Sequence, residues 1–456
     1  MELSIKKTVY IALGAQKNMA LNFGKILFAL LFFSASPLFA DNWETFGKDS
    51  KHTGYIEVNF KSPELKNIWK FTPSLHAWVY EKTSYEKGMN VWSSSYATLD
   101  IGDKKIIYSG FYDHNLYAID SETGEYIWRF TTGGTLNSSP AAKEINGTPF
   151  VFIASSDRTV YAIDGNTGKK IWGYETEAWD YTTSKSIPSS PIVEKIGEQY
   201  FLFICVWNNN FASFRNIQKG ELFSFNALSG ELIWRKKLTS LPLNSPAITY
   251  IGDKPVIFVT SHDGNLYSID ARNGNILWHF LSDSSIHSSP VIIKINNKEY
   301  VIFGTRFGNI YAIEAESSAI FWRIKTGHAV DSTGGFAVVE NKPLIFIGSH
   351  DRNVYAIDCS DGKRVWSFQT QNFIATSPAL ANIAGKIVVF INSMDDNIYC
   401  LDASSGKELW QYKTGKLMWK YTTRGDTPWS SPIVTENKKG PILIFGSYDG
   451  TMYAFN

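Results

Sequence analysis

A tryptophan that returns at a fixed interval constrains the fold of this chain more than any other feature. It closes an apolar segment each time, at the following positions: Trp128, Trp172, Trp234, Trp278, Trp322, Trp366 and Trp410. From Trp234 onward the interval is always 44 residues, and the first two members are also 44 residues apart. A repeat of about 40 to 50 residues is typical of the four-stranded blades of β-propellers. The interval therefore predicts a ring of small sheets.

Every repeat has the same internal order. The stretch 257–278 contains an apolar strand, an Asp-Gly turn, a Tyr-Ser-Ile-Asp strand, a second turn and a strand that ends in Trp278. A Ser-Ser-Pro segment, as at 288–290, begins one further strand ahead of such a stretch. The alternation of β-branched and aromatic residues favours half-buried strands, and we find no amphipathic helix longer than a turn or two. The chain is therefore expected to be all-β, with four antiparallel strands in each blade.

The two ends of the repeat region complement each other. Trp69 lies in a strand that has no repeat before it, whereas the last repeat stops at Asn456, before its tryptophan strand. Counting Trp69 brings the docking tryptophans to eight and therefore predicts eight blades. We expect one eight-bladed β-propeller domain over residues 41–456, closed by the N-terminal strand joining the last blade, so that no open sheet edge remains there.

The link before each tryptophan strand carries an acid or amide and, four residues later, a glycine, as in Asp120 and Gly124. Asp or Asn can hydrogen-bond the backbone of a tight turn, and glycine supplies the positive φ of a bulged hairpin, so these acids are expected to be structural. The fifth repeat departs from the pattern with Glu314 and Ser318, and Thr333-Gly334-Gly335 replaces the next Ser-Ser-Pro. We expect a locally distorted blade there.

The motif Ala-x-Asp-x-x-Thr-Gly-x-x-x-Trp, as in 118–128 and 162–172, resembles the tryptophan-docking repeat of pyrroloquinoline quinone (PQQ)-type propellers. The resemblance covers residues 42–456. That superfamily includes quinoprotein alcohol dehydrogenases and the BamB component of the outer-membrane assembly machinery. The motif is specific for the fold and not for an activity, because one fold hosts unrelated functions.

The N-terminus has the features of an export signal over residues 1–40. Lys25 precedes an apolar run at 26–33, and small residues precede a cut after Ala40; translation from Met19 would leave a signal of ordinary length. The run is shorter than the ~20 residues of a membrane span, and no Cys stands at the cut to carry a lipid. We expect a periplasmic or secreted, soluble, monomeric protein without a transmembrane span.

The net charge and the cysteine content narrow the kinds of ligand and cofactor that the chain is expected to bind. The formal net charge is +1, which gives no electrostatic reason to expect nucleic acid. Cys205, Cys359 and Cys400 lie in three different repeats and are expected to be buried thiols. The resemblance implies that quinoprotein dehydrogenases carry a disulfide between adjacent cysteines beside the quinone, and this sequence has no adjacent pair.

Insertions into the period mark where function is expected, because they map to loops on a working face. The ordinary link from a tryptophan to the proline of the next Ser-Ser-Pro segment is 12 residues long, but three links are 19, 22 and 26 residues long. The third repeat has a further insertion near 207–219. All four are expected at one mouth of the channel, and they carry these aromatic residues: Trp78, Tyr80, Trp92, Trp179, Tyr181, Trp207, Trp419, Tyr421 and Trp429. We predict an aromatic binding mouth. The alternative is that these rings pack on one another and hold the loops.

Other polar residues are better explained by structure than by chemistry. Six turns carry an aspartate that could suggest a metal ring but is expected to cap a hairpin: Asp113, Asp157, Asp263, Asp351, Asp395 and Asp449. His262 and His350 occupy equivalent turns and are interpreted as surface histidines too far apart for one ligand set. The Ser-Ser pairs are expected to satisfy backbone groups where the inner strands crowd. We predict no metal site and no catalytic residue.

The function that these features favour is a non-catalytic, exported scaffold of the bacterial cell envelope that binds a protein, an extended peptide or a glycan. The alternative is a PQQ- and Ca²⁺-dependent quinoprotein dehydrogenase, which needs oxygen ligands for the metal and cations for the quinone. A carbohydrate-binding propeller is a further alternative. No cofactor is expected except under the dehydrogenase alternative.

Overall fold

The computed structural model describes residue 42 and residues 44–62, 64–73, 93–176, 189–208, 219–242, 244–414, 430–447 and 451–456. The expected signal segment 1–40 lies outside these residues. All elements within them are β-strands, as the sequence predicts.

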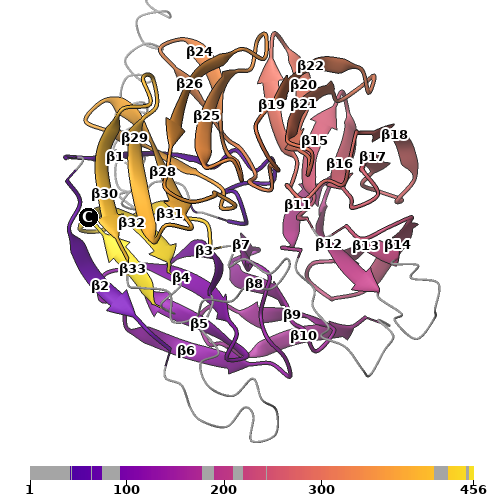
Figure 1. Ribbon diagram of the computed structural model, residues 1–456. Helices are drawn as coiled ribbons and strands as arrows, with labels where there is room; N and C mark the ends of the chain where they lie inside the picture. The colour runs from indigo at the N-terminus through magenta and orange to yellow at the C-terminus, as the bar shows by residue number, and fades with distance from the viewer. Residues whose placement is uncertain are drawn as a thin grey trace, which may run out of the picture. The chain divides into compact units, whose positions relative to one another are not determined.

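Eight sheets follow one another around a ring, and each sheet is one blade (Figure 1). Blade one consists of β3 (Ser93–Ile101), β4 (Lys104–Phe111), β5 (Asn115–Asp120) and β6 (Tyr126–Thr131). Blade two consists of β7 (Ala141–Ile145), β8 (Thr148–Ala154), β9 (Thr159–Asp164) and β10 (Lys170–Glu175). Blade three consists of β11 (Ile192–Ile196), β12 (Gln199–Asn208), β13 (Lys219–Asn226) and β14 (Leu232–Leu238). Blade four consists of β15 (Ala247–Ile251), β16 (Lys254–Thr260), β17 (Asn265–Asp270) and β18 (Ile276–Leu281).

The second half of the ring repeats this plan. Blade five consists of β19 (Val291–Ile295), β20 (Lys298–Gly304), β21 (Asn309–Glu314) and β22 (Ile320–Lys325). Blade six consists of β23 (Gly335–Val339), β24 (Lys342–Gly348), β25 (Asn353–Asp358) and β26 (Arg364–Gln369). Blade seven consists of β27 (Ala379–Ile383), β28 (Lys386–Ser393), β29 (Asn397–Asp402) and β30 (Glu408–Lys413), with β1 (Tyr55–Phe60) as a fifth, parallel strand beside β27. Blade eight consists of β31 (Ile433–Asn437), β32 (Gly440–Gly446), β33 (Met452–Phe455) and β2 (Asn67–Phe71).

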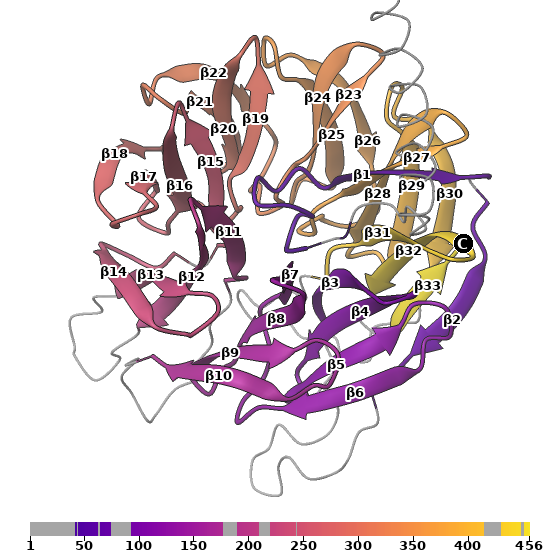
Figure 2. The same cartoon turned by 180° about the vertical axis from the view of Figure 1, so that it is seen from behind.

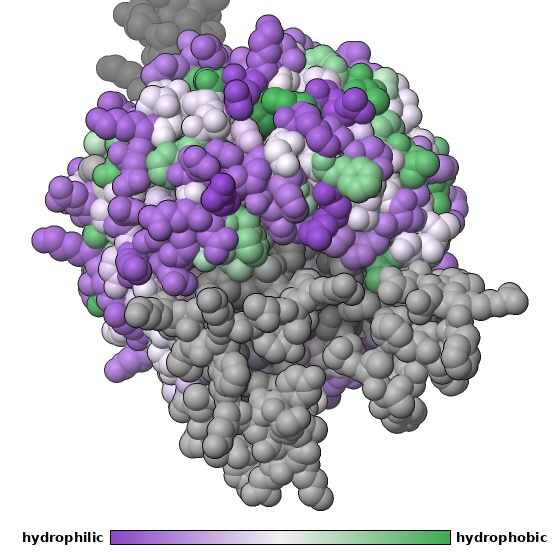
Figure 3. Space-filling model, in the orientation of Figure 1, coloured by the Kyte–Doolittle hydropathy of each residue, from purple (hydrophilic) through white to green (hydrophobic). Residues whose placement is uncertain are grey.

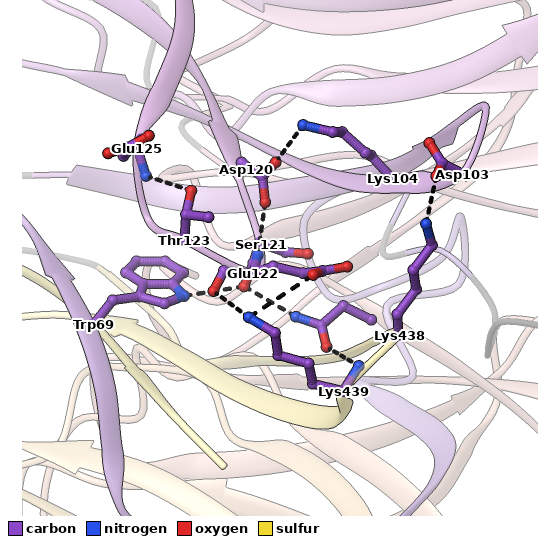
Figure 4. Close-up of polar contacts among 11 residues, drawn as sticks. Trp69, Asp103, Lys104, Asp120, Ser121, Glu122, Thr123, Glu125, Lys438 and Lys439 are labelled. Carbon is purple, nitrogen blue, oxygen red and sulfur yellow. Dashed lines mark hydrogen bonds and ion pairs between the residues drawn. The ribbon is translucent and has the colours of Figure 1, made fainter.

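The last blade is completed by the N-terminal strand, as predicted. β2 pairs antiparallel with β33, and Trp69 lies opposite Ala454. Figure 4 shows how blade eight then contacts blade one: the Trp69 indole donates to the Ser121 carbonyl at 3.0 Å, and the amide of Asn437 donates to the same oxygen at 3.0 Å. Lys439 Nζ adds a longer contact of 3.8 Å to Glu122. The first and last blades are therefore joined like any other neighbours.

The repeated tryptophans dock each blade onto the next. The indole N–H donates to a backbone carbonyl of the following blade in these pairs: Trp69 to Ser121 (3.0 Å), Trp128 to Gly165 (3.0 Å), Trp172 to Ala227 (2.9 Å), Trp234 to Ala271 (3.0 Å), Trp278 to Ala315 (3.2 Å), Trp322 to Cys359 (2.8 Å) and Trp366 to Ala403 (2.9 Å). Trp410 packs edge-to-face on Phe455 of blade eight at 5.4 Å. Each such hydrogen bond contributes only about 1 kcal/mol net. Burial of the large indole supplies most of the stabilisation.

The turn glycines are required by this docking. Gly168 has φ +70°, and a Cβ built on it would lie 2.7 Å from the Trp128 ring. At Gly168 the left-handed backbone and the ring that covers it therefore both disfavour a side chain.

Blade five is regular, so the prediction of local distortion there was wrong. Its four strands keep the pairing of the other blades, with the usual bulge between Ala312 and Ile313. Ser318 adopts the left-handed backbone of the missing glycine at φ 61°, and the cost is local to that turn. Thr333 supplies a hydroxyl where the other blades have a serine.

Hydroxyl groups of the inner strands form what we call the serine ring. In each step a backbone N–H donates to a side-chain oxygen of the next blade, in these pairs: Ser139 to Ser190 (2.9 Å), Ser190 to Ser245 (3.0 Å), Ser245 to Ser289 (3.1 Å), Ser289 to Thr333 (3.0 Å), Thr333 to Ser377 (3.1 Å) and Ser377 to Ser431 (3.0 Å). The expectation that these hydroxyls satisfy backbone groups is confirmed.

Residues 44–54, which we call the N-terminal strap, cross the centre of the ring before β1 (Figure 2). Their carbonyls accept from inner-strand N–H groups of five blades in these pairs: Glu44 from Ala142, Ser50 from Ile248, Lys51 from Ile292, Thr53 from Phe336 and Gly54 from Leu380. This role could not be predicted from the sequence, because the strap has no regular structure and no repeat.

Apolar residues of the second and third strands fill the space between blades. Phe152 and Trp172 of blade two pack with Phe225 of blade three, and Trp172 and Phe225 have their ring centres 6.3 Å apart. Each such buried ring contributes about 1.5 to 3 kcal/mol by leaving water. The packed blades therefore hold the turns at both ends of their strands in place.

No helix among the described residues is long and apolar enough to cross a membrane. Outside the grey part, the face in Figure 3 mixes hydrophilic residues with scattered hydrophobic ones.

Candidate functional site

Each inner strand runs from one end of the channel, here called the mouth, toward the strap. In blade six the order is Asp331, then Thr333 in the serine ring, then Phe336, which is bonded to the strap. In an antiparallel blade, the turns between second and third strands lie at the same end as the links between blades. The mouth therefore combines those turns with the residues that precede the serine ring.

Most of the predicted aromatic mouth lies outside the described residues. This applies to Trp78, Tyr80, Trp92, Trp179, Tyr181, Trp419, Tyr421 and Trp429. The backbone of Trp207 belongs to β12 and pairs with Gly220 of β13. β12 has 10 residues where its counterpart β16 has 7, so blade three is longer at the mouth. The aromatic mouth stays a prediction.

The turn aspartates cap hairpins, as expected. One carboxylate oxygen accepts from a backbone N–H two residues on, and the other accepts from a tyrosine hydroxyl four residues on, in these turns: Asp113 with Tyr117, Asp157 with Tyr161, Asp263 with Tyr267, Asp351 with Tyr355 and Asp395 with Tyr399. Asp449 lies outside the described residues. With both oxygens engaged, the five described aspartates do not form a metal ring.

A buried carboxylate organises the mouth between blades four and six. Arg306 Nη1 donates to Asp331 Oδ2 at 2.6 Å, and His350 Nε2 lies 3.1 Å from the same oxygen. Burial raises the pKa of Asp331, but the contact with His350 and the charge of Arg306 outweigh burial and hold the pKa below its usual value. Asp331 is therefore ionised although its side chain is only 2% exposed.

Three imidazoles lie around this carboxylate, and a fourth lies beside one of them. His262 and His287 stack with ring centres 4.0 Å apart, and burial lowers their pKa values to about 4 and about 3. His350 is 4.9 Å from Phe373 and parallel to His328 at 6.0 Å. The interpretation of His262 and His350 as surface histidines was wrong, because both are largely buried, and the charge of Asp331 acts on both.

The site contains buried polar atoms without a hydrogen-bond partner among the described residues. They are Oδ1 of Asp331, Nε2 of His262 and Nε2 of His350, which lies 3.1 Å from Asp331 Oδ2 but does not form a hydrogen bond with it. An unsatisfied buried polar group costs about 1 to 3 kcal/mol. Such atoms are expected where a ligand or water completes the site. We call Asp331, Arg306, His262, His287 and His350 the Asp331 cluster.

The Asp331 cluster does not fit a calcium ion and a quinone. Ca²⁺ takes six to eight oxygen ligands, whereas the groups around Asp331 are a guanidinium and imidazoles. Among the described residues, no three His, Cys, Asp or Glu side chains are placed to hold a metal ion. Cys205, Cys359 and Cys400 are free and buried, and burial raises the pKa of Cys205 to about 12, so these thiols are unreactive.

One signal could have revealed this cluster. Asp331 and His287 occupy the same position in their repeats, and Arg306, His262 and His350 occupy a second shared position. The residue type at both positions changes from blade to blade, whereas the neighbouring residues are repeated. Comparing the repeats by position would have singled out both.

Comparison with known proteins agrees with this architecture. The family model described as outer membrane protein assembly factor BamB matches residues 76–293 and 262–456. No curated protein sequence matches the chain. Among solved structures, a europium-containing methanol dehydrogenase aligns with a TM-score of 0.66 at 13% identity, over 91% of this chain and 98% of that chain. A quinohemoprotein alcohol dehydrogenase from Comamonas testosteroni has a TM-score of 0.65 at 14% identity, over 91% and 80%.

BamB from Moraxella catarrhalis aligns with a TM-score of 0.55 at 13% identity, over 86% of this chain and 99% of that chain. At these identities the structural likeness shows the fold alone. The family match covers most of the sequence and includes strands of all eight blades. The chain therefore belongs to the BamB-like family of PQQ-type propellers.

Proposed function

We propose that the chain is an exported, non-catalytic propeller that binds a protein of the bacterial cell envelope at its mouth. The family description, which names outer membrane protein assembly, supports a protein partner. The observation that carries the proposal is that the mouth is where the blades differ. In the described turns, the position of Arg306 is filled elsewhere by these residues: Tyr112, Ser156, His262, His350 and Met394. Residues that the repeat does not require for its structure can be used to recognise a partner.

Photo-cross-linking in intact cells tests this proposal. Phe307, 64% exposed, lies in a mouth turn, and Val338, 56% exposed, lies on β23 toward the opposite end of its strand. A photoreactive residue at position 307 is expected to give one discrete adduct with an envelope protein, and the same residue at position 338 none. Equal adducts from both positions, or none from position 307, would contradict the proposal.

The predicted aromatic mouth can be tested in the same assay. We expect Trp179→Ala, Tyr181→Ala and Trp419→Ala together to weaken the adduct from position 307, because aromatic residues dominate binding hot spots. An unchanged adduct with an intact fold would show that these rings only hold their loops.

The second candidate is a quinoprotein dehydrogenase, which the likeness to two alcohol-oxidising enzymes brings into consideration. The Asp331 cluster argues against it, because it offers Ca²⁺ one carboxylate where six to eight oxygen ligands are needed, and because its guanidinium is already paired with that carboxylate. We therefore place no catalytic step in this site.

We further propose that residues 1–40 direct export and that the mature protein is a monomer in the periplasm or outside the cell. N-terminal sequencing of the exported protein would test the first point, with Asp41 as the expected first residue. Light scattering of the purified protein would test the second.

A further inference from the structure

We propose that the Asp331 cluster is a binding site for an uncharged, hydroxyl-rich group, such as one unit of a saccharide. This inference goes beyond the proposed function, which concerns a protein partner, and does not depend on it. It rests on the unpartnered atoms, the charge balance and the exposed aromatic ring at this part of the mouth.

The unpartnered atoms define the donors and acceptors that a ligand must bring. Oδ1 of Asp331 can only accept, and Nε2 of His262 can accept or donate according to its tautomer. Arg306 uses one N–H for Asp331 and is 40% exposed, so further donors of its planar fork face outward. A hydroxyl group both donates and accepts, so neighbouring hydroxyls on one ligand can satisfy all three residues.

The charge balance favours a neutral ligand. Arg306 and Asp331 already neutralise each other at 2.6 Å. A cationic ligand would meet Arg306, and an anionic one would meet Asp331, so either gains little from the pair. A zwitterion would have to separate the two charges before binding them. Hydroxyls can instead bond to Oδ1 and to the remaining N–H groups while the pair stays intact.

The turn that carries Arg306 also carries an exposed aromatic residue. Phe307 follows Arg306 in the chain and is 64% exposed. Its backbone is held on both sides, since its N–H donates to Ser284 Oγ at 3.0 Å and its carbonyl accepts from Lys325 Nζ. An exposed aromatic side chain on a turn whose backbone is held, next in the chain to a polar residue of the site, suits a ligand with one apolar and one polar face.

Asp331 is buried, so a hydroxyl that reaches Oδ1 has to displace a neighbouring side chain. We therefore expect binding to move the imidazole resonances of His262 and His350, which contact or surround the carboxylate. The exposed His279, on β18 outside the cluster, should not respond.

The experiment titrates the purified full propeller with glucose, N-acetylglucosamine, maltose and trehalose, followed by histidine NMR and calorimetry. Glucosamine, glucuronate and glycylglycine serve as cationic, anionic and zwitterionic probes. We expect at least one neutral saccharide to bind at millimolar concentration or better and to shift His262 and His350. Binding of only a charged or zwitterionic probe, or of no probe, would overturn the proposal.

Two pairs of variants locate the site. Asp331→Asn removes the negative charge and replaces one acceptor oxygen by an NH2 donor, and it is expected to raise Kd about tenfold, the order expected for one hydrogen bond to a charged group, whereas Arg272→Ala, at the opposite end of blade four, should leave Kd unchanged. If Asp331→Asn fails to fold, Phe307→Ala replaces it as an exposed variant, with the 65% exposed Leu281→Ala as its control. Equal effects of Phe307→Ala and Leu281→Ala would contradict the site. The cross-linking assay is independent, because it detects a protein partner in cells without added sugar.

Discussion

His52 is the most completely buried titratable side chain of the strap, and its chemistry depends on one hydrogen bond. Its Nδ1 lies 2.8 Å from the Pro290 carbonyl, and since a carbonyl only accepts, Nδ1 carries the hydrogen. Nε2 is buried and has no partner among the described residues. Burial lowers the pKa of His52 to about 4, because a proton on Nε2 would place an unsolvated charge in the channel.

This shift predicts a loss of stability in acid. The folded-state pKa of about 4 lies below the unfolded value, so the unfolded chain takes up the proton first as the pH falls. The contribution of His52 is complete above about pH 6.5 and is lost on the way to about pH 4, by about 3 kcal/mol in the free energy of unfolding. His262 and His287 act in the same direction.

Urea unfolding at several pH values measures this effect. His52→Asn should flatten the dependence between pH 7 and pH 5, and Asn also tolerates the positive φ of this position. His279→Asn, at an exposed site, is the matched control. An equally steep profile in His52→Asn and the parent would rule out His52 as the cause.

The need for glycine in the turns that contact the docking tryptophans can be tested by exchanging serine and glycine at two equivalent positions. Ser318→Gly should stabilise the protein by about 1 kcal/mol, because glycine has no penalty at φ 61°. Gly362→Ser should destabilise it by more than that, since a Cβ there would lie 2.8 Å from Trp322 at φ +74°. Denaturant midpoints of the two variants measure both effects, and a neutral Gly362→Ser would show that the ring moves aside easily.

At the scale of elements, the ring depends on two N-terminal pieces that act differently. β2 supplies the outer strand of blade eight, and the strap joins five blades through their inner strands. Sequence predicted the first because Trp69 carries the repeat signature and the last repeat is incomplete. The strap escaped prediction because its bonds use backbone carbonyls, which any sequence possesses.

Closure by β2 predicts a graded response at Trp69, which is 8% exposed. Trp69→Phe loses the hydrogen bond to Ser121 and should cost about 1 kcal/mol beyond the change in packing. Trp69→Ala also loses the ring and should cost about 3 to 5 kcal/mol. Deleting residues 42–72 should abolish the single cooperative unfolding transition, which calorimetry would record. A deletion variant as stable as the parent would refute closure by this strand.

At the scale of the whole molecule, the fold was predictable and the site was only partly so. Eight tryptophans, their turn glycines and the Ser-Ser pairs each repeat, so their roles follow from one another. Blade five shows that a break in the repeat pattern does not always change the structure. Ser318 and Thr333 differ from the residues of the other repeats, but they keep the same backbone geometry and hydrogen bonding. The Asp331 cluster shows the opposite limit, because residues from different repeats meet only when neighbouring blades pack together.

Within this family fold, the identity of the ligand separates a scaffold from an enzyme. A quinoprotein would hold a metal ion and a quinone at the mouth, whereas a scaffold presents the mouth to a partner. The described donors favour the scaffold, since Asp331 is surrounded by Arg306 and imidazoles rather than by oxygen ligands.

The most direct test is a calorimetric titration of the mature protein with PQQ in the presence of Ca²⁺ or a lanthanide ion, run beside a dye-linked alcohol oxidation assay. A PQQ-dependent alcohol dehydrogenase serves as the positive control. A non-catalytic binding propeller predicts no saturable heat and no turnover under conditions in which the control shows both. Saturable binding of PQQ with alcohol oxidation would contradict the scaffold proposal and establish the chain as a quinoprotein.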